Sequence, residues 1–499
     1  RQRSWGVPIP VFYDTSDSTK VLLDEEVIDH VIGIVASHPR GTDAWFELDE
    51  VDLLPEKYKQ EAKDGKWRKG TDTMDVWFDS GTSWSGVLGG KSDNEVKADM
   101  YLEGSDQHRG WFQSSLLTSV ASRGIPPYKT VLTHGFVLDE KGFKMSKSLG
   151  NVVDPMSVIE GGNDKKKDPA YGADVLRLWV ASVDYTGDVC IGSNVMKQTF
   201  ESYRRIRNVA RYLLGNLFDF QQEDRVPYAD LPSLDKWILG RLSVLLRDVR
   251  SSYDEYQFNK AVNALLKFVT ADLSNFYLDI AKDRLYISGT DDFRRRSCQT
   301  VLVDVLEGLT KCVAPLLPHM AEDIHSSGGK ERSVFEEVWP AHLEEFEGFG
   351  EDEWKRVREV REDVNKALEI ARNDKAIGAS LDARAVIYVD DDDHDTERIL
   401  RGLMGIPVDS ESEVDDLKYV LMLSQVEVVK GGGQDIGEGS GGYFLSKDAG
   451  VSGCAVRVDK AEGKKCERCW FFDETVGSDK ENNLCKRCNE VIAKKGAMV

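Results

Sequence analysis

KMSKSLGN, at residues 144–151, is the stretch that decides the fold, because it sets two lysines on a short loop of serine and glycine. Lys144 and Lys147 stand three residues apart, with Gly142 before them and Gly150 after them. Lysine carries a compact charge on a flexible stem, so the pair can move onto the charge that develops on a leaving pyrophosphate. The stretch therefore predicts a mobile phosphate clamp, with a solvated basic turn as the alternative for any KxxK pair.

Size and charge bound the class of protein. The chain has 499 residues, of which 41% are hydrophobic, enough for several cores and about three domains. No run approaches the ~20 apolar residues of a membrane helix, which predicts a soluble multidomain protein. The net charge of −22 argues against nucleic-acid binding over the whole surface, so any such contact must be local. Because residues 1–6 lack an initiator Met and a signal peptide, we expect a fragment that begins inside a domain.

The first part of the chain has an α/β pattern. Short β-branched or apolar runs at residues 7–12 and 131–133 predict strands, and residues 111–122 predict a helix. Residues from about 15 to 70 carry scattered charges without strong periodicity, so we interpret them as an insertion into the sheet domain. Residues 163–169 have the composition of an exposed loop.

After residue 195 the pattern becomes helical, with apolar residues every three or four positions, and predicts a bundle of four or more helices. The motif PLLP at residues 315–318 is interpreted as its closing signal, followed by a few turns up to residue 340. Residues 353–372 predict one more helix, residues 385–389 and 426–429 predict strands, and residues 431–442 form a glycine-rich loop. Arginines at 204–211 are a candidate RNA contact, with a solvated helix face as the alternative.

Four cysteines near the C-terminus have the spacing of a metal site. Cys466 and Cys469 form one CxxC pair, and Cys485 and Cys488 form a second pair fifteen residues later. This spacing is typical of a tetrahedral, structural zinc centre, and two redox pairs or disulfides are the alternative. The adjacent WFF at residues 470–472 could stack on RNA or form the core of the knuckle.

The other cysteines are scattered among apolar or small neighbours. We expect Cys190, Cys298, Cys312 and Cys454 to be inert core thiols. Without a disulfide-like framework, a reducing compartment is favoured.

A second polar motif, YLEGSDQHRGWF at residues 101–112, lies upstream of the lysines. It places carboxylates, an amide and small residues where a strand end opens into a helix, which is where doubly wound sheets bind ligands. Carboxylate and amide groups can bond ribose hydroxyls and an ammonium group, while Gly104 and Gly110 allow close approach of the backbone. Taken alone, the motif could also be a capped helix start.

Taken together, the motifs resemble a known family. RQRSWGVP at 1–8, DVWFDSG at 75–81, YLEGSDQHRGWF, LTHGF at 132–136 and KMSKS are similar in content and order to the second half of class Ia aminoacyl-tRNA synthetases, most of all the isoleucine branch. The valine branch tends to carry WFSS where this chain has WFDS, and the leucine branch lacks the EGSDQHRGWF form. The resemblance extends to SYRRIRN at 202–208, FYLDI at 276–280, VNKA at 364–367 and a four-cysteine knuckle of the bacterial and organellar type.

The resemblance implies an α/β region followed by an all-α region and a small mixed C-terminal region. Residues 1–195 would be the second half of a Rossmann-type class I catalytic domain, and residues 196–345 a helical-bundle anticodon-binding domain. Residues 346–450 would be a C-terminal junction region with a helix and a small mixed segment, and residues 451–499 a zinc-binding knuckle.

The resemblance also implies roles for individual residues. Those that would hold the aminoacyl-adenylate are Glu103, Gly104, Asp106 and Gln107, with His134 lining the adenosine pocket and Trp77 and Trp111 walling the aliphatic side-chain pocket. Lys144 and Lys147 would act on the ATP phosphates, Lys147 most directly. The implied reaction is attack of the isoleucine carboxylate on the α-phosphorus of ATP, then acyl transfer to the terminal ribose of tRNA. Neither step needs a protein nucleophile, so positioning and charge stabilisation carry it, at roughly 3 kcal/mol for one well-aimed donor.

One departure limits the resemblance. The first ATP signature, of the HIGH type, and the large editing insertion are both absent from the 499 residues. We therefore expect these residues alone to be inactive in adenylation. A sister synthetase for valine, leucine or methionine stays open, because a pocket that reads one methylene discriminates by only ~1 to 3 kcal/mol. The second alternative is a noncatalytic RNA-binding protein built from the remnant of a synthetase. Such a protein would not need the two lysines that act on pyrophosphate.

The partners implied by the resemblance are an isoleucine-accepting tRNA, L-isoleucine and ATP with magnesium, together with one structural zinc ion. A monomer without membrane contact is expected. The compartment would be the cytoplasm of a bacterium, or the mitochondrion or chloroplast of a eukaryote.

Overall fold

The structure, a computed structural model, describes residues 6–88, 96–166, 168–340, 346–404, 416–431, 442–477 and 483–496. Residues 1–5 of the RQRSWGVP motif and residues 432–441 of the predicted glycine-rich loop lie outside this range. The chain divides into two compact units, Arg1–Leu138 with Tyr185–Val189, and Asp139–Asp184 with Cys190–Val499. Each unit is described by itself, and the four domain ranges expected from the sequence stay predictions.

The first unit begins with a small antiparallel sheet of its own. Its strand order is β2 (Val21–Leu22), β1 (Phe12–Asp14) and β3 (Trp67–Lys69). The connecting helices are α1 (Glu25–Ser37), η1 (Gly41–Asp43), α2 (Ala44–Glu47), α3 (Glu50–Leu53) and α4 (Glu56–Lys63). Phe12 and Trp45 pack edge to face in the core that these elements share. The segment interpreted as an insertion therefore has its own hydrophobic core.

A parallel strand pair follows in the same unit. β4 (Ala98–Gly104) pairs with β5 (Tyr128–His134), and α7 (Trp111–Arg123) forms the crossover between them. The predicted helix at 111–122 and the predicted strand at 131–133 are confirmed. The predicted strand at 7–12 is wrong except at Phe12, where β1 begins. Pro8 and Pro10 lack the backbone N–H that hydrogen bonding between strands needs, and Pro8 makes one isolated bridge to Thr73.

Short elements complete the segments around this pair. They are α5 (Val76–Gly81), α6 (Ser83–Val87), η3 (Ser105–Arg109), β6 (Val137–Leu138) and β7 (Val189–Cys190). The prediction of Cys190 as a core thiol is wrong, because the two-residue strand β7 turns its side chain outward and the residue is exposed. The other three cysteines of this group, Cys298, Cys312 and Cys454, are buried as predicted.

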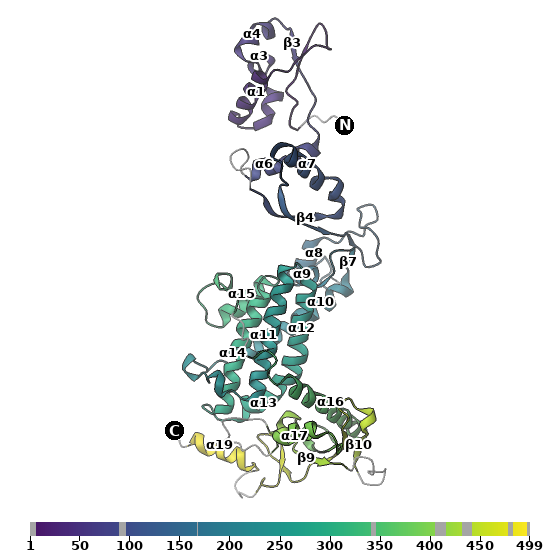
Figure 1. Ribbon diagram of the computed structural model, residues 1–499, viewed down its shortest axis with the longest axis vertical. Helices are drawn as coiled ribbons and strands as arrows, with labels where there is room; N and C mark the ends of the chain where they lie inside the picture. The colour runs from purple at the N-terminus through teal and green to yellow at the C-terminus, as the bar shows by residue number, and fades with distance from the viewer. Residues whose placement is uncertain are drawn as a thin grey trace. The chain divides into compact units, whose positions relative to one another are not determined.

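Long helices dominate the second unit (Figure 1). In chain order, the helices of this part are the short α8 (Pro155–Glu160), then α9 (Ala173–Ser182), α10 (Ser193–Gly215), α11 (Ser233–Asp254), α12 (Phe258–Lys267), the π-helical η6 (Phe268–Tyr277), α13 (Leu278–Ile287), α14 (Phe293–Val313) and α15 (Pro318–Ser327). Two single turns, η4 (Gln222–Asp224) and η5 (Tyr228–Asp230), join α10 to α11. The predicted bundle is confirmed. However, PLLP does not close it, because Pro318 is a favourable first residue of the further helix α15.

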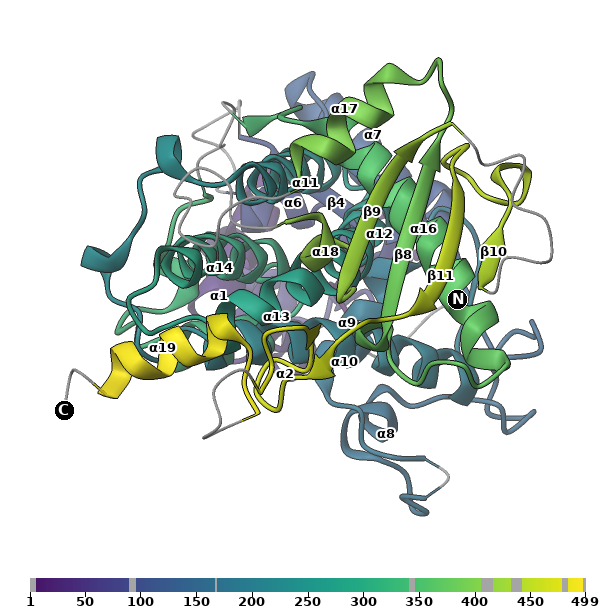
Figure 2. The ribbon, with the colours of Figure 1, turned by 90° about the horizontal axis from the view of Figure 1, so that it is seen from below.

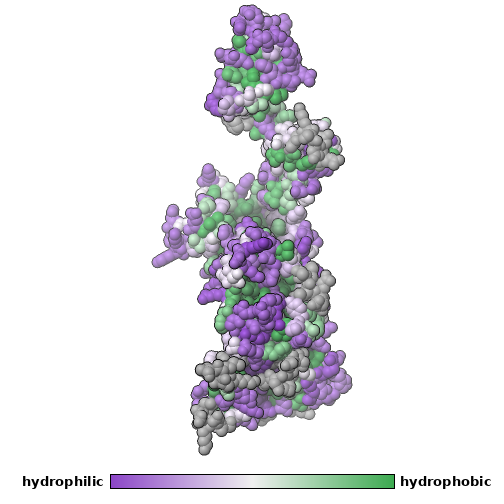
Figure 3. Space-filling model, turned by 90° about the vertical axis from the view of Figure 1, so that its left-hand side faces the viewer, coloured by the Kyte–Doolittle hydropathy of each residue, from purple (hydrophilic) through white to green (hydrophobic). Residues whose placement is uncertain are grey.

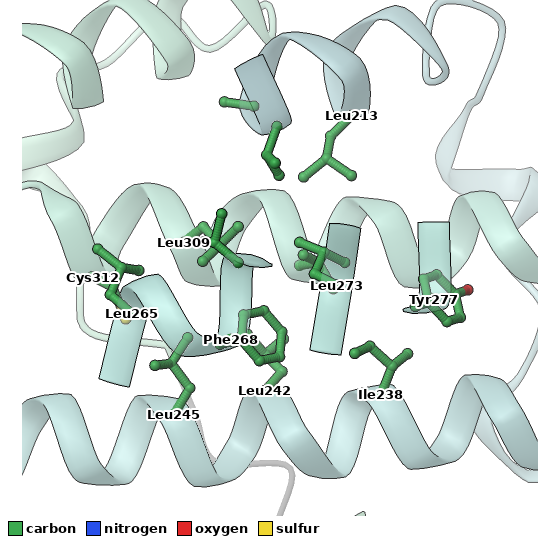
Figure 4. Close-up of a cluster of buried hydrophobic side chains, with 14 of the residues drawn as sticks. Leu213, Ile238, Leu242, Leu245, Leu265, Phe268, Leu273, Tyr277, Leu309 and Cys312 are labelled. Carbon is green, nitrogen blue, oxygen red and sulfur yellow. The ribbon is translucent and has the colours of Figure 1, made fainter. Parts of the chain in front are cut away.

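The bundle core is built from the apolar stripes of these helices. Figure 4 shows side chains of α10, α11, η6 and α14 meeting in one buried layer, among them Leu213, Leu242, Phe268 and Leu309. On the face shown in Figure 3, hydrophobic residues also reach the surface in patches between hydrophilic ones. The 3.6-residue period of the sequence thus corresponds directly to the packed interior.

A buried ion pair crosses this core. Arg284 of α13 donates to both carboxylate oxygens of Asp235 of α11, at 2.8 and 2.6 Å, and both side chains are fully buried. The Tyr277 hydroxyl donates to the same carboxylate at 2.7 Å. The guanidinium also reaches the Ser297 hydroxyl oxygen and a backbone carbonyl of α14, so the pair fixes α13 between α11 and α14.

A four-stranded sheet with a long helix forms the C-terminal part. The strand order is β10 (Tyr443–Leu445), β11 (Ala455–Lys460), β8 (Ala383–Val389) and β9 (Gln425–Lys430), and α16 (Glu351–Asn373) packs its apolar residues against the sheet (Figure 2). The predicted helix at 353–372 and both predicted strands are confirmed. The remaining elements are η7 (Val334–Glu336), η9 (Ser380–Asp382), α17 (His394–Gly402), α18 (Leu417–Val420), η10 (Lys447–Ala449), β12 (Lys464–Lys465), β13 (Phe472–Asp473) and α19 (Lys486–Gly496).

Within the ranges that the structure describes, no helix combines the length and the apolar character that a bilayer crossing requires.

Candidate active site and metal centre

The ends of the two parallel strands bring several predicted residues together. In the register of β4 and β5, Glu103 lies opposite Thr133 and Gly104 lies opposite His134. A Cβ on Gly104 would lie 2.7 Å from an Asp106 carboxylate oxygen and 3.7 Å from Cε1 of His134. Gly104, Asp106 and His134 therefore meet at the carboxyl edge of the strands, where α/β sheets bind their ligands, and Glu103 lies at the same edge. Both carboxylates are exposed.

The orientation of His134 is set locally. Its Nδ1 lies 2.8 Å from the carbonyl oxygen of Gly135. A carbonyl can only accept, so Nδ1 is the donor in this contact, and Nε2 is the ring nitrogen left for a ligand. The next residue has no room for a side chain, because a Cβ on Gly135 would lie 2.3 Å from the backbone of Gly187. This close approach holds the end of β5 in place, and no sequence signal marks Gly135 for that role.

The two predicted pocket tryptophans meet at the start of α7. The Trp77 ring lies across Gly110, where a Cβ would come within 2.8 Å of its carbons. Trp111 stacks on Tyr101 with ring centroids 4.1 Å apart, and its indole N–H donates to the Ser80 carbonyl oxygen at 3.0 Å. Trp77 is 48% exposed. One tryptophan is thus fixed in an aromatic stack, while the other presents an open apolar surface.

Gln107 supports the same junction. Its side-chain oxygen accepts from the backbone N–H of Trp111 at 3.1 Å, which fastens the first turn of α7. This single bond supports the start of α7, whose N-cap residue, Gly110, has no side-chain cap of its own. It does not compete with ligand binding, because the carboxylates of Glu103 and Asp106 take no part in it.

The KMSKS loop belongs to the second unit, and its base is held by two side chains. Asp139 accepts from the backbone N–H of Phe143 at 2.8 Å and from the Asn151 amide at 2.9 Å. Asn151 in turn accepts from the backbone N–H of Ser146 at 2.9 Å. These hydrogen bonds, that of Asn151 first, hold the pKa of the Asp139 carboxyl below its usual value. We name this arrangement of Asp139 and Asn151 the loop clasp.

The loop clasp reaches the KMSKS motif itself, since the Asn151 amide also donates to the backbone carbonyl oxygen of Lys144 at 3.3 Å. Both Lys144 and Lys147 are exposed, and among the described residues no hydrogen bond or ion pair engages the Lys147 ammonium. Gly142 and Gly150, on either side, have φ of +81° and +65°, which glycine adopts without strain. The loop therefore has a hydrogen-bonded base and an exposed, charged tip. The sequence predicted the lysines, but not the two side chains that hold their loop.

The four cysteines of the C-terminal pairs converge. Their sulfur atoms all lie within 4.8 Å of one another, those of Cys469 and Cys485 are 3.7 Å apart, and all four residues are buried. Zinc–sulfur bonds of ~2.3 Å at tetrahedral angles place sulfurs ~3.8 Å apart, so the group fits a zinc centre with four cysteine ligands. No disulfide joins them.

Neighbouring groups shift the pKa values of these thiols in opposite directions. Burial raises the pKa of Cys466, but N–H groups of Cys469, Cys485 and Arg468 outweigh it and bring the pKa to about 7. The pKa of Cys469 rises to about 12, chiefly because it donates to Cys485. Four thiolates this close repel one another, and a divalent cation removes that repulsion.

The aromatic residues of the knuckle divide into two groups. Phe471 is buried and packs edge to face against Tyr419, with centroids 5.2 Å apart. Trp470 is 62% exposed and has a φ of +66°. Phe471 therefore belongs to the miniature core, as one interpretation expects, while stacking of RNA on the exposed Trp470 stays a prediction.

The arginine face of α10 is partly engaged. Arg204 pairs with Glu201 and Arg207 with Asp323, each at 2.7 Å. Arg205 and Arg211 are exposed and have no ion-pair partner within the described parts of the chain. Two of the four predicted arginines are thus available for a phosphate.

Comparison with known proteins identifies two family matches in the chain. Residues 1–192 match the family described as tRNA synthetases class I (I, L, M and V). Residues 235–387 match the anticodon-binding domain of tRNA ligases.

Two curated relatives of this chain are named isoleucine–tRNA ligase. The chain is 51% identical to the isoleucine–tRNA ligase of Synechococcus sp. over 98% of its length and 50% of that protein. It is 48% identical to the chloroplastic/mitochondrial isoleucine–tRNA ligase of Arabidopsis thaliana, over 99% of the chain and 45% of that protein. The chain spans about half the length of the curated relatives it matches.

A solved structure shares the fold. The Agrobacterium radiobacter K84 agnB2 LeuRS, in its ternary complex with tRNA and LeuAMS, is 18% identical with a TM-score of 0.51, over 87% of this chain and 51% of that chain.

Proposed function

Because this chain belongs to the class I aminoacyl-tRNA synthetases, we propose that the whole protein ligates L-isoleucine to its cognate tRNA through an isoleucyl-adenylate. The observation that carries the proposal is the identity of about half of all residues with isoleucine–tRNA ligases over nearly the entire chain. In this proposal the chain supplies the adenylate-binding strand ends, the KMSKS loop, the anticodon-binding bundle and the zinc knuckle.

The strand ends would hold the adenylate. Glu103 and Asp106 offer carboxylates for the ribose hydroxyls and the amino group, and Gly104 lets the backbone approach closely. Nε2 of His134, which takes no part in the contact with Gly135, would bond the adenosine. Trp77 and Trp111 would wall the aliphatic side chain, since both lie where α5 meets α7. Gln107 would act chiefly by holding this junction.

The KMSKS loop would stabilise charge on the phosphates of ATP, which binds as its magnesium complex. The loop clasp fixes where the loop begins and ends, while Lys147 keeps a free ammonium on a long stem. Such a tip can follow the pyrophosphate as it leaves, with Lys144 as the second charge. Neither lysine transfers a proton, because the step requires only charge stabilisation.

The bundle and the knuckle would bind tRNA. Arg205 and Arg211 provide exposed charge for phosphates, and Trp470 provides an exposed ring for stacking on a base. Four buried cysteines would hold one zinc ion that has no open coordination position, so its part is structural. We expect a monomer, in the cytoplasm of a bacterium or in an organelle of a eukaryote.

Isoleucine-dependent ATP–pyrophosphate exchange by the whole protein tests this function, with valine as competitor. We expect exchange that prefers isoleucine and falls by about 100-fold or more in Lys147→Ala. Lys141→Ala removes another exposed lysine outside the KMSKS motif and serves as the matched control, which should retain its activity. Exchange that prefers valine, leucine or methionine would indicate a sister enzyme. Absence of exchange with every aliphatic amino acid, together with retained tRNA binding, would favour the noncatalytic remnant.

A further inference from the structure

One residue of the second CxxC turn points away from the metal site and into the bundle. Arg487 lies between Cys485 and Cys488, in the first turn of α19. Its guanidinium makes two parallel hydrogen bonds to the carboxylate of Asp283 on α13, at 2.7 and 2.8 Å. Figures 1 and 2 both place α19 beside α13. This is the bidentate geometry in which arginine binds a carboxylate most strongly.

The pair is buried. The Arg487 side chain is 12% exposed and that of Asp283 is 6% exposed. The guanidinium also lies over the Tyr419 ring, 4.9 Å from its centroid, and 5.8 Å from the centroid of Phe471. Burial raises the pKa of Asp283, but the positive charge of Arg487 outweighs it and holds that pKa below its usual value. The carboxylate is therefore charged and depends on the guanidinium that faces it.

The second cation near Asp283 does not take the place of the first. The nearest nitrogen of Arg294, on α14, lies 3.6 Å from the carboxylate, which is longer than a hydrogen bond. Its guanidinium also faces the Tyr419 ring, 5.2 Å from the ring centroid. Withdrawal of Arg487 would thus leave a buried carboxylate without its bidentate partner, which is strongly unfavourable.

The metal ligands on both sides of Arg487 decide where its backbone lies. The Cys485 N–H donates to the Cys466 sulfur at 3.3 Å, and Arg468 donates to the Cys488 sulfur at 3.6 Å. A single ion bound to Cys485 and Cys488 holds both ends of the turn that carries Arg487. Without the ion, the sulfurs hold that turn only through weak hydrogen bonds.

We propose that Arg487 and Asp283 latch the zinc knuckle onto α13, so that metal binding and docking of the knuckle on the bundle stabilise each other. The latch, named here as the Arg487–Asp283 pair, rests on the zinc centre proposed above. Coupling of two binding events is reciprocal by thermodynamic linkage. Through the latch, bound metal therefore stabilises the bundle around α13, and Asp283 of the bundle raises the affinity of the knuckle for the metal. Arg487 is a positioning residue in this arrangement, because it touches no ligand.

The adjacent residue provides a matched control. Lys486 occupies the same turn between the same two cysteines, but it is 78% exposed and lies 3.9 Å from Glu490 of its own helix. Substitution of Lys486 removes a charge of the same sign from the same turn. It leaves the latch intact.

Zinc affinity is the first readout, measured on the 499-residue chain by competition with a chromophoric chelator, after the metal content has been determined by mass spectrometry. Partners outside the ligand shell typically contribute about 10- to 100-fold to metal affinity. We expect losses of that size in Arg487→Met and in Asp283→Asn, an intermediate loss in Arg487→Lys, and no loss in Lys486→Met. Asp283→Asn keeps the knuckle sequence untouched, so it tests the latch even where an altered knuckle fails to fold.

Hydrogen exchange of peptides from α13 is the second readout. Chelation of zinc should accelerate exchange there in the unaltered chain and in Lys486→Met. In Arg487→Met the exchange should already be fast, with little further response to chelation. Zinc affinity unchanged in both Arg487→Met and Asp283→Asn, or exchange in α13 that ignores chelation, would overturn the latch. Absence of bound metal in the unaltered chain would instead overturn the zinc centre itself.

Discussion

Substitution of the buried Asp235 by leucine should destabilise the bundle more than almost any other single change. Asp235 and Arg284 are both fully buried, and two hydrogen bonds of 2.8 and 2.6 Å join them. Asp235→Leu keeps the branched shape of the side chain, with bulkier methyl groups in place of the two oxygens, but leaves a guanidinium in the core without a counter-charge. Loss of one partner of a buried pair costs about 3 to 5 kcal/mol of unfolding free energy. The Tyr277 hydroxyl would also lose its acceptor, which adds to this cost.

The double variant Asp235→Leu, Arg284→Met separates this effect from a loss of packing. With both charges removed, no buried ion remains to be compensated, and the expected stability lies near that of the unaltered chain, because buried pairs replaced by apolar residues are often neutral or stabilising. Urea unfolding followed by far-ultraviolet circular dichroism measures all four chains of this cycle. A cost below about 1 kcal/mol for Asp235→Leu, or a double variant as unstable as the two single changes combined, would refute the reasoning.

Three further predictions concern the loop, the metal and pH. Asn151→Ala opens the loop clasp, so pyrophosphate exchange by the whole protein should fall about tenfold while urea stability stays unchanged; equal activity would show that the clasp is dispensable. Cys488→Ser removes one of four sulfur ligands, and metal content measured by mass spectrometry should become substoichiometric. Arg295 lowers the pKa of Asp219 to about 2, so this carboxyl has a lower pKa in the folded chain than in the unfolded chain. The charged Asp219 therefore stabilises the folded chain by about 2 kcal/mol above about pH 4, and this stabilisation is lost as pH falls through about 2. Asp219→Asn should abolish that part of the acid dependence in thermal unfolding, and an identical pH profile would contradict the assignment.

Much of the fold could be predicted because long helices repeat their apolar positions many times. The stripes of α10 and α16 extend over 23 residues each, so a few exceptions do not obscure the period. α1 was missed, since only Val27 and Val31 of its 13 residues are buried. The continuation into α15 was missed for a different reason: proline ends one helix and begins another equally well, and the sequence does not distinguish the two.

The metal site could be predicted from spacing, whereas the supports of the sites could not. A CxxC turn brings two sulfurs together by local geometry alone, so the sequence suffices for Cys466 and Cys469. The loop clasp depends on where Asp139 and Asn151 meet after the chain has turned. The latch joins Arg487 to Asp283, which are remote in sequence. Neither has a local signal, because the contact exists only once tertiary structure has formed.

Charging of tRNA with isoleucine tests the central proposal most directly. The whole protein would be incubated with unfractionated tRNA, ATP, magnesium and each labelled aliphatic amino acid in turn, and acid-precipitable label would be counted. The account predicts that isoleucine is attached, that it is found only on isoleucine-accepting tRNA, and that Lys147→Ala removes the activity. Attachment of valine, leucine or methionine in its place, or of no amino acid at all, would contradict it.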